Sequence, residues 1–317
     1  MISRRNIRVK VMQALYAAES QQEPLPESGY PSTSEEAHKL LQRYFDQSRA
    51  LLVYLIYFIT EVSLYADAYA RQRASRHLPT AEDLRVNTKL AGNELLLQIL
   101  ELKSWKAALK REHPEALIDR EMVRKIFLEL LQSDAYTEYI GTEARDKKKE
   151  KSMLEFILSG IMLPNEGFIA HLEELFPNWD DDADMMVLLV NNFFSKLNTY
   201  DFSKLISKEK KQFAFSLLET VLGKKEQTQE LIRPKLKNWD PDRIAILDMI
   251  LMRMGVCEFL YFETIPPKVT INEYIDLAKE YSTPQSGQFV NGILDNIHKD
   301  LVKDERMHKI AFKPNIQ

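Results

Sequence analysis

The chain carries WDPDRIAILDMILMRMGVCEFL at residues 239–260 and PPKVTINEYIDLAKEYSTPQSGQFVNGILDNIHKDL at residues 266–301, and these segments decide its fold. Three helix starts are marked by residue types that favour N-termini: Asp240 with Pro241, Thr270 with Glu273 in capping-box spacing, and Thr283 with Pro284. Helical spacing gives two apolar faces: Ile244, Leu247, Leu251 and Met254, then Val290, Ile293, Leu294, Ile297 and Leu301. Three amphipathic helices in succession must pack together, so this stretch is predicted to be the centre of a helical domain.

Composition favours helix over most of the chain. Its 317 residues are enough for one large or two ordinary domains, and 45% of them are apolar. Only 9 are glycine, and no run of alternating β-branched residues occurs, so an all-α fold is predicted. The net charge of −4 argues against nucleic-acid binding over the whole surface, so any such binding must come from a local patch.

The single cysteine and the lack of a leader point to a cytoplasmic protein. Cys257 stands among apolar neighbours and is interpreted as a small core residue, and one cysteine forms no disulfide framework. The chain opens with arginines and polar residues, so no secretory signal is expected. The most apolar window, residues 50–59, is too short to cross a bilayer and is interpreted as buried helix, with no membrane partner expected.

A first helix is predicted over residues 3–18, with Ser3 as its N-cap. Arg4, Arg5, Arg8 and Lys10 lie in or beside its first two turns, where cations oppose the helix dipole. Positive groups beside helix-start N–H groups suit a phosphate backbone, so these four residues are candidates for RNA binding. A solvated basic terminus is the alternative interpretation.

Further helices are predicted over residues 35–77, 92–113, 119–140 and 207–222, the last capped by Ser207, and further apolar segments lie at residues 152–163 and 183–198. The aromatic residues of the first fall at core-like spacing, and its end carries Arg71, Arg73 and Arg76, either a second basic patch or a solvated helix end. The run 143–151 is interpreted as an exposed helix surface. The four aspartates of residues 178–184 lack the spacing of a calcium loop and favour a helix start.

Signals of catalysis are missing from the sequence. The six histidines are scattered, and neither HExxH spacing nor a cysteine pair occurs. No GxGxxG, GxxxxGK[ST] or GxSxG motif is present. We therefore expect no enzymatic activity, no cofactor and no metal.

Taken together, the two ends of the chain resemble the NusB family of transcription antitermination factors. The resemblance rests on RRNIRVKVMQALY at residues 4–16 and on the two C-terminal segments, in which INEYIDLAK and QFVNGILD follow KV in this order. It covers residues 3–18 and 207–301. The resemblance predicts a NusB-like helical bundle: residues 1–20 as its basic first helix, 21–200 as a helical insertion, 201–302 as the C-terminal core and 303–317 as a tail.

The family resemblance implies an RNA-binding protein that recognises boxA-type RNA in rRNA leaders. It implies two protein partners, the ribosomal protein NusE and the RNA polymerase antitermination complex. Carried over by position, the RNA-facing residues are Arg4, Arg5, Arg8, Ser286 and Phe289, and the NusE-facing residues are Arg243 and Asp248. Gln285 stands where an acidic residue is often found, and Asn6, Pro284, Gly287 and Gln288 depart from the usual pattern, which puts the RNA sequence preference in doubt.

Several alternatives remain open. Phe289 borders the apolar face of residues 290 and 293 and is either a core residue or a base-stacking one. Asp248 is either a NusE contact or a surface carboxylate paired with a nearby arginine. The same fold forms the N-terminal domain of rRNA cytosine methyltransferases, but nothing after residue 301 supplies a cofactor-binding domain. A helical protein-interaction adaptor, whose insertion carries the function, is the other candidate.

Overall fold

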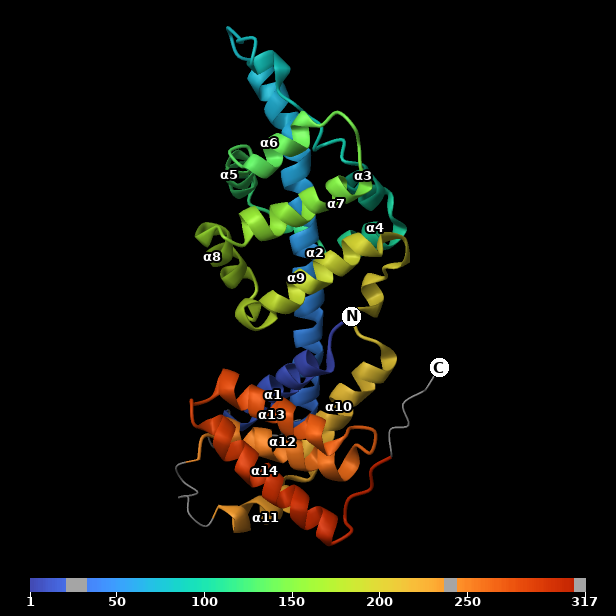
Figure 1. The fold of residues 1–317 in the computed structure, drawn as a ribbon, viewed down its shortest axis with the longest axis vertical. Coiled ribbons are helices and arrows are strands. Elements are labelled where there is room, and N and C mark those ends of the chain that lie inside the picture. The colour runs from blue at the N-terminus through green and yellow to red at the C-terminus, as the bar shows by residue number, and fades with distance from the viewer. Residues whose placement is uncertain (21–32, 237–243, 311–317) are drawn as a thin grey trace, which may run out of the picture. The chain divides into compact units, whose positions relative to one another are not determined.

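The computed structural model describes residues 1–20, 33–236 and 244–310, and within these residues the regular elements are all helices (Figure 1). The all-α prediction is confirmed. The α-helices are α1 (Arg4–Ser20), α2 (Thr33–Ala74), α3 (Glu94–Glu101), α4 (Lys103–Glu112), α5 (Arg120–Leu130), α6 (Asp134–Gly141), α7 (Lys147–Phe156), α8 (Glu166–Leu175), α9 (Trp179–Ser195), α10 (Lys208–Gly223), α11 (Lys225–Ile232), α12 (Ile246–Tyr261), α13 (Pro267–Tyr281) and α14 (Ser286–Lys303). A π-helical turn at Ile157–Met162 follows α7.

The helices form two compact units that share α2. One unit holds residues 46–206, with residues 1–2, and the other holds residues 3–45 and 207–317. We name them the insertion unit and the terminal unit. The start of α2 belongs to the terminal unit and the rest of it to the insertion unit. The division into a family domain and an insertion at residues 20 and 200 stays a prediction.

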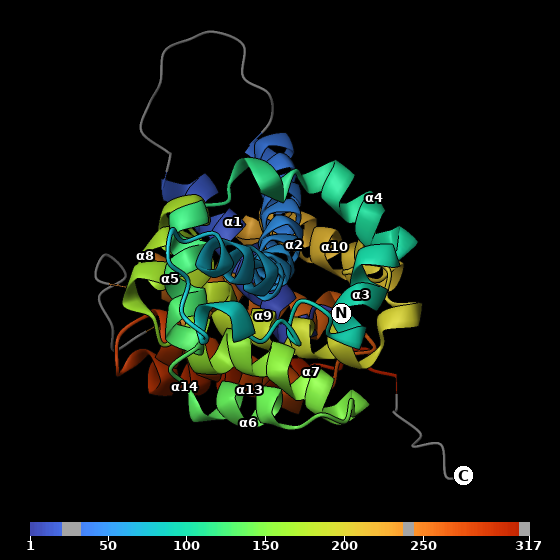
Figure 2. The same ribbon diagram turned by 90° about the horizontal axis from the view of Figure 1, so that it is seen from above.

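In the insertion unit, α3 to α9 lie around the second part of α2 (Figures 1 and 2). The aromatic residues of α2 pack against these helices, as their spacing predicts. The Phe58 ring lies 4.7 Å from that of Phe168 on α8, and the Tyr65 ring lies 5.3 Å from that of Phe127 on α5. The Tyr54 hydroxyl lies 2.6 Å from Nε2 of His171. These rings therefore serve as core and not as a surface for stacking bases.

In the terminal unit, α12 is the central helix and packs against α1, α10, α11, α13 and α14. The expectation of a single apolar face on it is wrong, because residues 250–259 are buried on every side. A helix that is buried all round belongs in the middle of a bundle. Ile244, which was predicted to lie on the apolar face of this helix, lies before its first residue, Ile246. The face predicted on α14 is confirmed, since its five residues are all buried.

Two of the predicted helix N-caps are confirmed, and others are wrong. Ser3 and Ser207 cap α1 and α10 as expected, because their hydroxyls accept from the backbone N–H of Asn6 at 3.1 Å and of Lys210 at 3.3 Å. The capping box at Thr270 is wrong: α13 begins one turn earlier, with Pro267 in its first turn, so Thr270 lies inside the helix. The cap at Asp240 and Pro241 lies outside the described residues.

The cap predicted at Thr283 is also wrong. Helix α14 begins at Ser286 without a side-chain cap, and the Thr283 hydroxyl lies 2.9 Å from that of Ser286.

Two long helices predicted for the middle of the chain are each broken in two. The stretch 92–113 divides at Leu102, whose backbone is extended. The stretch 119–140 divides at Ser133, whose hydroxyl accepts from the N–H of Tyr136 and so caps a new helix. The aspartates of residues 180–182 occupy the first turn of α9, as expected.

One helix in the described part of the chain, α2, is long and apolar enough to cross a membrane. Its apolar window is 67% buried within the protein, as in the core helix of a soluble protein. Length and composition of this helix are therefore weak evidence of a membrane span.

Gly255 allows α12 and α14 to pack closely. A Cβ atom at this position would lie 2.9 Å from both Cδ atoms of Leu294, which is itself fully buried. We predict that Gly255→Ala lowers the free energy of unfolding by about 1–3 kcal/mol through overpacking. Gly292→Ala is the matched control, because nothing lies within 4 Å of a Cβ there, and it should add about 0.5–1 kcal/mol. Urea unfolding measures both, and equal effects would contradict the close packing.

The prediction that Cys257 is a core residue is confirmed, since the side chain is fully buried. Burial raises the pKa of its thiol from 9.0 to about 12. As pH rises from 9 toward 12, the unfolded thiol ionises while the folded one stays protonated, so stability is lost. Urea unfolding at pH 8 and 10.5 should therefore show a larger loss for the wild type than for Cys257→Ala. Equal losses would contradict a buried, protonated thiol.

Candidate functional site

Arg8 is buried against α12 and α13. Its side chain is 2% exposed, and its Nε and Nη2 donate to the two carboxylate oxygens of Glu258 at 2.8 and 3.1 Å. Glu258 is fully buried and accepts two more hydrogen bonds, from the hydroxyls of Thr270 at 2.9 Å and of Tyr274 at 2.8 Å. Glu273 lies 3.4 Å from Nη1 of Arg8. Thr270 and Glu273, one turn apart on α13, thus complete this buried cluster.

Electrostatics keep the buried Arg8 guanidinium charged. Burial lowers the pKa of the Arg8 guanidinium, but the charge and hydrogen bonds of Glu258 outweigh burial and raise the pKa above its usual value. Burial, with the negative charge of Glu258, also raises the pKa of Tyr274 well above 10.0. A charge pair removed from water persists only when its remaining hydrogen-bonding positions are satisfied, as they are here.

The four N-terminal cations proposed as RNA contacts are not equally accessible in the structure. Arg8 is engaged by Glu258, and Lys10 is 1% exposed, with its Nζ 6.0 Å from the centre of the Tyr44 ring. Neither side chain is presented to a phosphate. The physical reason is that α1 is buried on most of its circumference between residues 7 and 12, so its later cations lie inside the bundle.

Arg4 and Arg5 are the members of the cluster that reach the surface. Their side chains are 39% and 37% exposed. Each is paired with a carboxylate from another helix: Arg4 with Glu209 of α10 at 2.6 Å, and Arg5 with Glu280 of α13 at 2.6 Å. The guanidinium of Arg4 also lies 5.6 Å from the centre of the Phe213 ring. The structure therefore offers two accessible cations whose present partners are exposed and replaceable.

The predicted residues at the start of α14 are mostly buried. Ser286 is 2% exposed and donates to Asp248 at 2.7 Å, and Phe289 is 9% exposed. Of the two interpretations of Phe289, the core one agrees with its burial. Asp248 is itself 6% exposed, so it is not a surface carboxylate, and its contact with NusE stays a prediction. Arg243 lies outside the described residues, and Gln285 is exposed beside the buried group.

The arginines at the end of α2 form an intramolecular clamp. Arg73 donates to the buried Asp83, as does Arg76 at 3.2 Å. The backbone N–H of Thr80, followed by its hydroxyl and by Arg73, holds the pKa of Asp83 below its usual value. Of the two interpretations, a second basic patch or a solvated helix end, the second agrees with the exposure of Arg71 and Arg76, whereas Arg73 is only partly exposed.

The burial of the Arg8–Glu258 pair could have been predicted in part from the sequence. Glu258 stands inside the apolar run of α12, and a carboxylate in such a run requires a buried cation. Glu209 and Glu280 carry no comparable signal, because their pairing depends on how α1 packs. Within the described residues, no three His, Cys, Asp or Glu side chains converge to hold a metal ion.

Comparison with known proteins identifies a family for the C-terminal part of the chain. The NusB family model matches residues 180–299. The transcription antitermination protein NusB of Methylacidiphilum infernorum is 44% identical over 104 residues, which span 33% of this chain and 72% of the relative. That of Salinibacter ruber is 44% identical over 99 residues, which span 31% of this chain and 62% of the relative.

A solved structure, T. maritima NusB, is 29% identical and covers 40% of this chain and 85% of that one, with a TM-score of 0.30. This TM-score is too low for a comparison of the two folds.

We predict that Arg8→Met lowers the free energy of unfolding by about 3–5 kcal/mol, because it leaves the Glu258 carboxylate buried without a cation. Replacing both Arg8 and Glu258 by methionine should restore part of this loss. Arg4→Met, which removes an exposed pair, should cost less than about 1 kcal/mol. Denaturant unfolding followed by circular dichroism measures all three. If Arg8→Met were as mild as Arg4→Met, the buried pair would not hold α1 in place.

Proposed function

This chain belongs to the NusB family, and from that premise we propose that it is an RNA-binding transcription antitermination factor. The proposed target is boxA-type RNA in rRNA leaders. The proposed partners are the ribosomal protein NusE and, through it, the RNA polymerase antitermination complex. The relatives that match the chain are named transcription antitermination proteins, which supports the general function.

The observation that carries RNA binding is the exposure of Arg4 and Arg5 at the first turn of α1. Two guanidinium groups beside a helix start provide fixed donors for phosphate oxygens. Exposed ion pairs contribute little to stability, so a phosphate can replace Glu209 or Glu280 at small cost. We propose that Arg4 and Arg5 make the RNA contact that the sequence assigned also to Arg8 and Lys10. Ser286 and Phe289, the other residues proposed from sequence, are largely buried.

For NusE we propose the surface at the start of α12. Asp248 is buried there, but Ile246 is 49% exposed, an apolar side chain of the kind that protein partners cover. Arg243 stays a proposed NusE contact from the family resemblance alone. We also propose that the protein works in the cytoplasm without catalysis.

The adaptor alternative differs from RNA binding in its use of the basic helix start. Charge reversal at Arg8 cannot discriminate between them, since it would disrupt the buried pair. The double variant Arg4→Glu/Arg5→Glu can, because an adaptor would keep its protein partner while an RNA-binding factor loses RNA.

Arg5→Glu should weaken binding to a fluorescein-labelled boxA-type RNA by about tenfold or more, and it should lower the salt slope by about 0.7, because one phosphate contact on a single strand is lost. Fluorescence anisotropy at two salt concentrations, with and without NusE, measures this. Lys303→Glu is the matched control, with the same charge change on an exposed residue of α14. Equal effects of the two variants would refute an RNA surface at Arg5, and equal affinity for a scrambled RNA would refute boxA recognition.

Glu280→Gln should strengthen RNA binding by about two- to fivefold, because it frees Arg5 from a competing carboxylate. The same anisotropy assay measures the change. Asp300→Asn, at another exposed carboxylate, controls for the change in net charge. An unchanged affinity would mean that the Arg5–Glu280 pair does not compete with RNA.

A further inference from the structure

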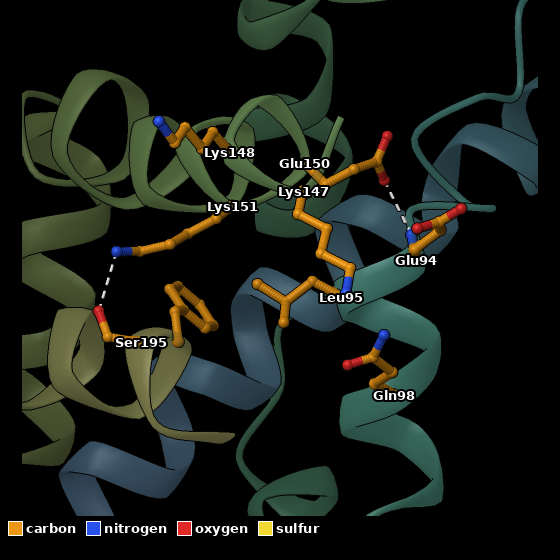
Figure 3. Close-up of a pocket in the computed structure, with 9 residues that line it drawn as sticks. Glu94, Leu95, Gln98, Lys147, Lys148, Glu150, Lys151 and Ser195 are labelled. Carbon is orange, nitrogen blue, oxygen red and sulfur yellow. Dashed lines mark hydrogen bonds between the residues drawn. The ribbon is translucent and has the colours of Figure 1, made fainter. Parts of the chain in front are cut away.

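A cleft in the insertion unit gathers lysines beside an apolar wall. It has a volume of about 340 Å³ and lies between α3, α7 and the end of α9 (Figure 3). Lys147, Lys148 and Lys151 line it from α7, and Leu95 and Gln98 line it from α3. Figure 3 shows Lys147 reaching from α7 toward Leu95 and Gln98, while Lys151 reaches toward Ser195. The residues of α7 expected to form only an exposed helix surface thus form one side of a cleft.

Positive charge in this cleft exceeds negative charge. Among the described residues, no carboxylate lies within ion-pair distance of Lys147 or Lys148, and both side chains are exposed. Lys151 donates to the Ser195 hydroxyl at 2.8 Å and lies 3.2 Å from Glu155.

The two carboxylates that line the cleft do not neutralise these lysines. Glu150 is buried, accepts from the backbone N–H of Glu94 at 2.8 Å, and lies 3.3 Å from Arg145. Glu94, the other carboxylate in the lining, is exposed to solvent. An anion entering the cleft therefore meets two lysines, Lys147 and Lys148, that have no carboxylate within ion-pair distance among the described residues.

The opposite side of the cleft is suited to a base. Leu95 and Phe194 provide apolar surface, and the exposed amide of Gln98 provides both a donor and an acceptor. Protein sites for unstacked bases combine these features: an apolar wall for the base, a polar group for its edge, and cations for the adjoining phosphates. An acidic peptide would use the lysines but not the wall and the amide.

We propose that this cleft binds a nucleotide of single-stranded RNA, with the base against Leu95 and Gln98 and the adjoining phosphates on Lys147 and Lys148. The inference rests on the proposed RNA-binding function and gives the insertion a part in it. The volume is at the lower end of the range for small-ligand sites, which suits one nucleotide.

The test uses the full chain and a labelled boxA-type RNA extended by single-stranded nucleotides on both sides. Lys147→Gln/Lys148→Gln should weaken binding about tenfold and reduce the salt slope by about 1.4, the value for two phosphates on a single strand. Gln98→Ala should weaken binding without changing the slope. Lys110→Gln/Lys125→Gln is the matched control, because these exposed lysines of the same unit do not line the cleft. With 4-thiouridine in the RNA, cross-links should map to the peptide that contains Leu95 and Gln98.

The outcomes separate this inference from the proposed function. If Arg5→Glu loses RNA while Lys147→Gln/Lys148→Gln binds like the control double variant, the cleft is no RNA subsite and the proposed function stands. If the wild type binds no RNA, both proposals fail. Binding of labelled AMP and of labelled poly-glutamate is measured in the same assay. Binding of either that depends on Lys147 and Lys148, with RNA affinity unchanged, would assign the cleft to a free nucleotide or an acidic peptide and overturn the RNA subsite.

Discussion

The buried ion pair between Arg8 and Glu258 is the interaction on which the terminal unit depends. Removing both charges from water is costly, and the cost is offset only because Thr270, Tyr274 and Glu273 complete the hydrogen-bonding and charge requirements. Those partners come from α13, while Glu258 comes from α12. The pair therefore fixes α1 against two helices at once, and it fixes which cations of α1 remain outside the bundle.

That constraint explains the small size of the exposed basic surface. Arg4 and Arg8 are one turn apart and lie at the same distance from the Phe213 ring, yet one is at the edge of the bundle and the other inside it. Arg4 and Arg5 reach solvent because they precede the point at which α1 enters the core. With a net charge of −4, the chain has little general attraction for RNA, so these residues must act with other local groups.

The insertion unit follows a different principle. Its core is built on the aromatic side chains of α2, which contact rings on helices far away in sequence. Charged groups of this unit are mostly used internally, as in the clamp of Arg73 and Arg76 on Asp83. Lys147 and Lys148 have no such partner among the described residues. The cleft beside α7 therefore differs from the rest of the unit in having lysines that are not paired within the part of the protein that the structure describes.

The sequence by itself determined the helical class, the caps at Ser3 and Ser207, the apolar face of α14 and the core position of Cys257. Each of these follows from residues within a few turns of one another, where periodicity and capping rules apply. The tertiary structure decided the burial of Arg8, Lys10 and Asp248, the role of Thr270 and the breaks at Leu102 and Ser133. A charged side chain is buried or exposed according to its partner, and the partner of Arg8 lies 250 residues away, beyond the reach of any local pattern.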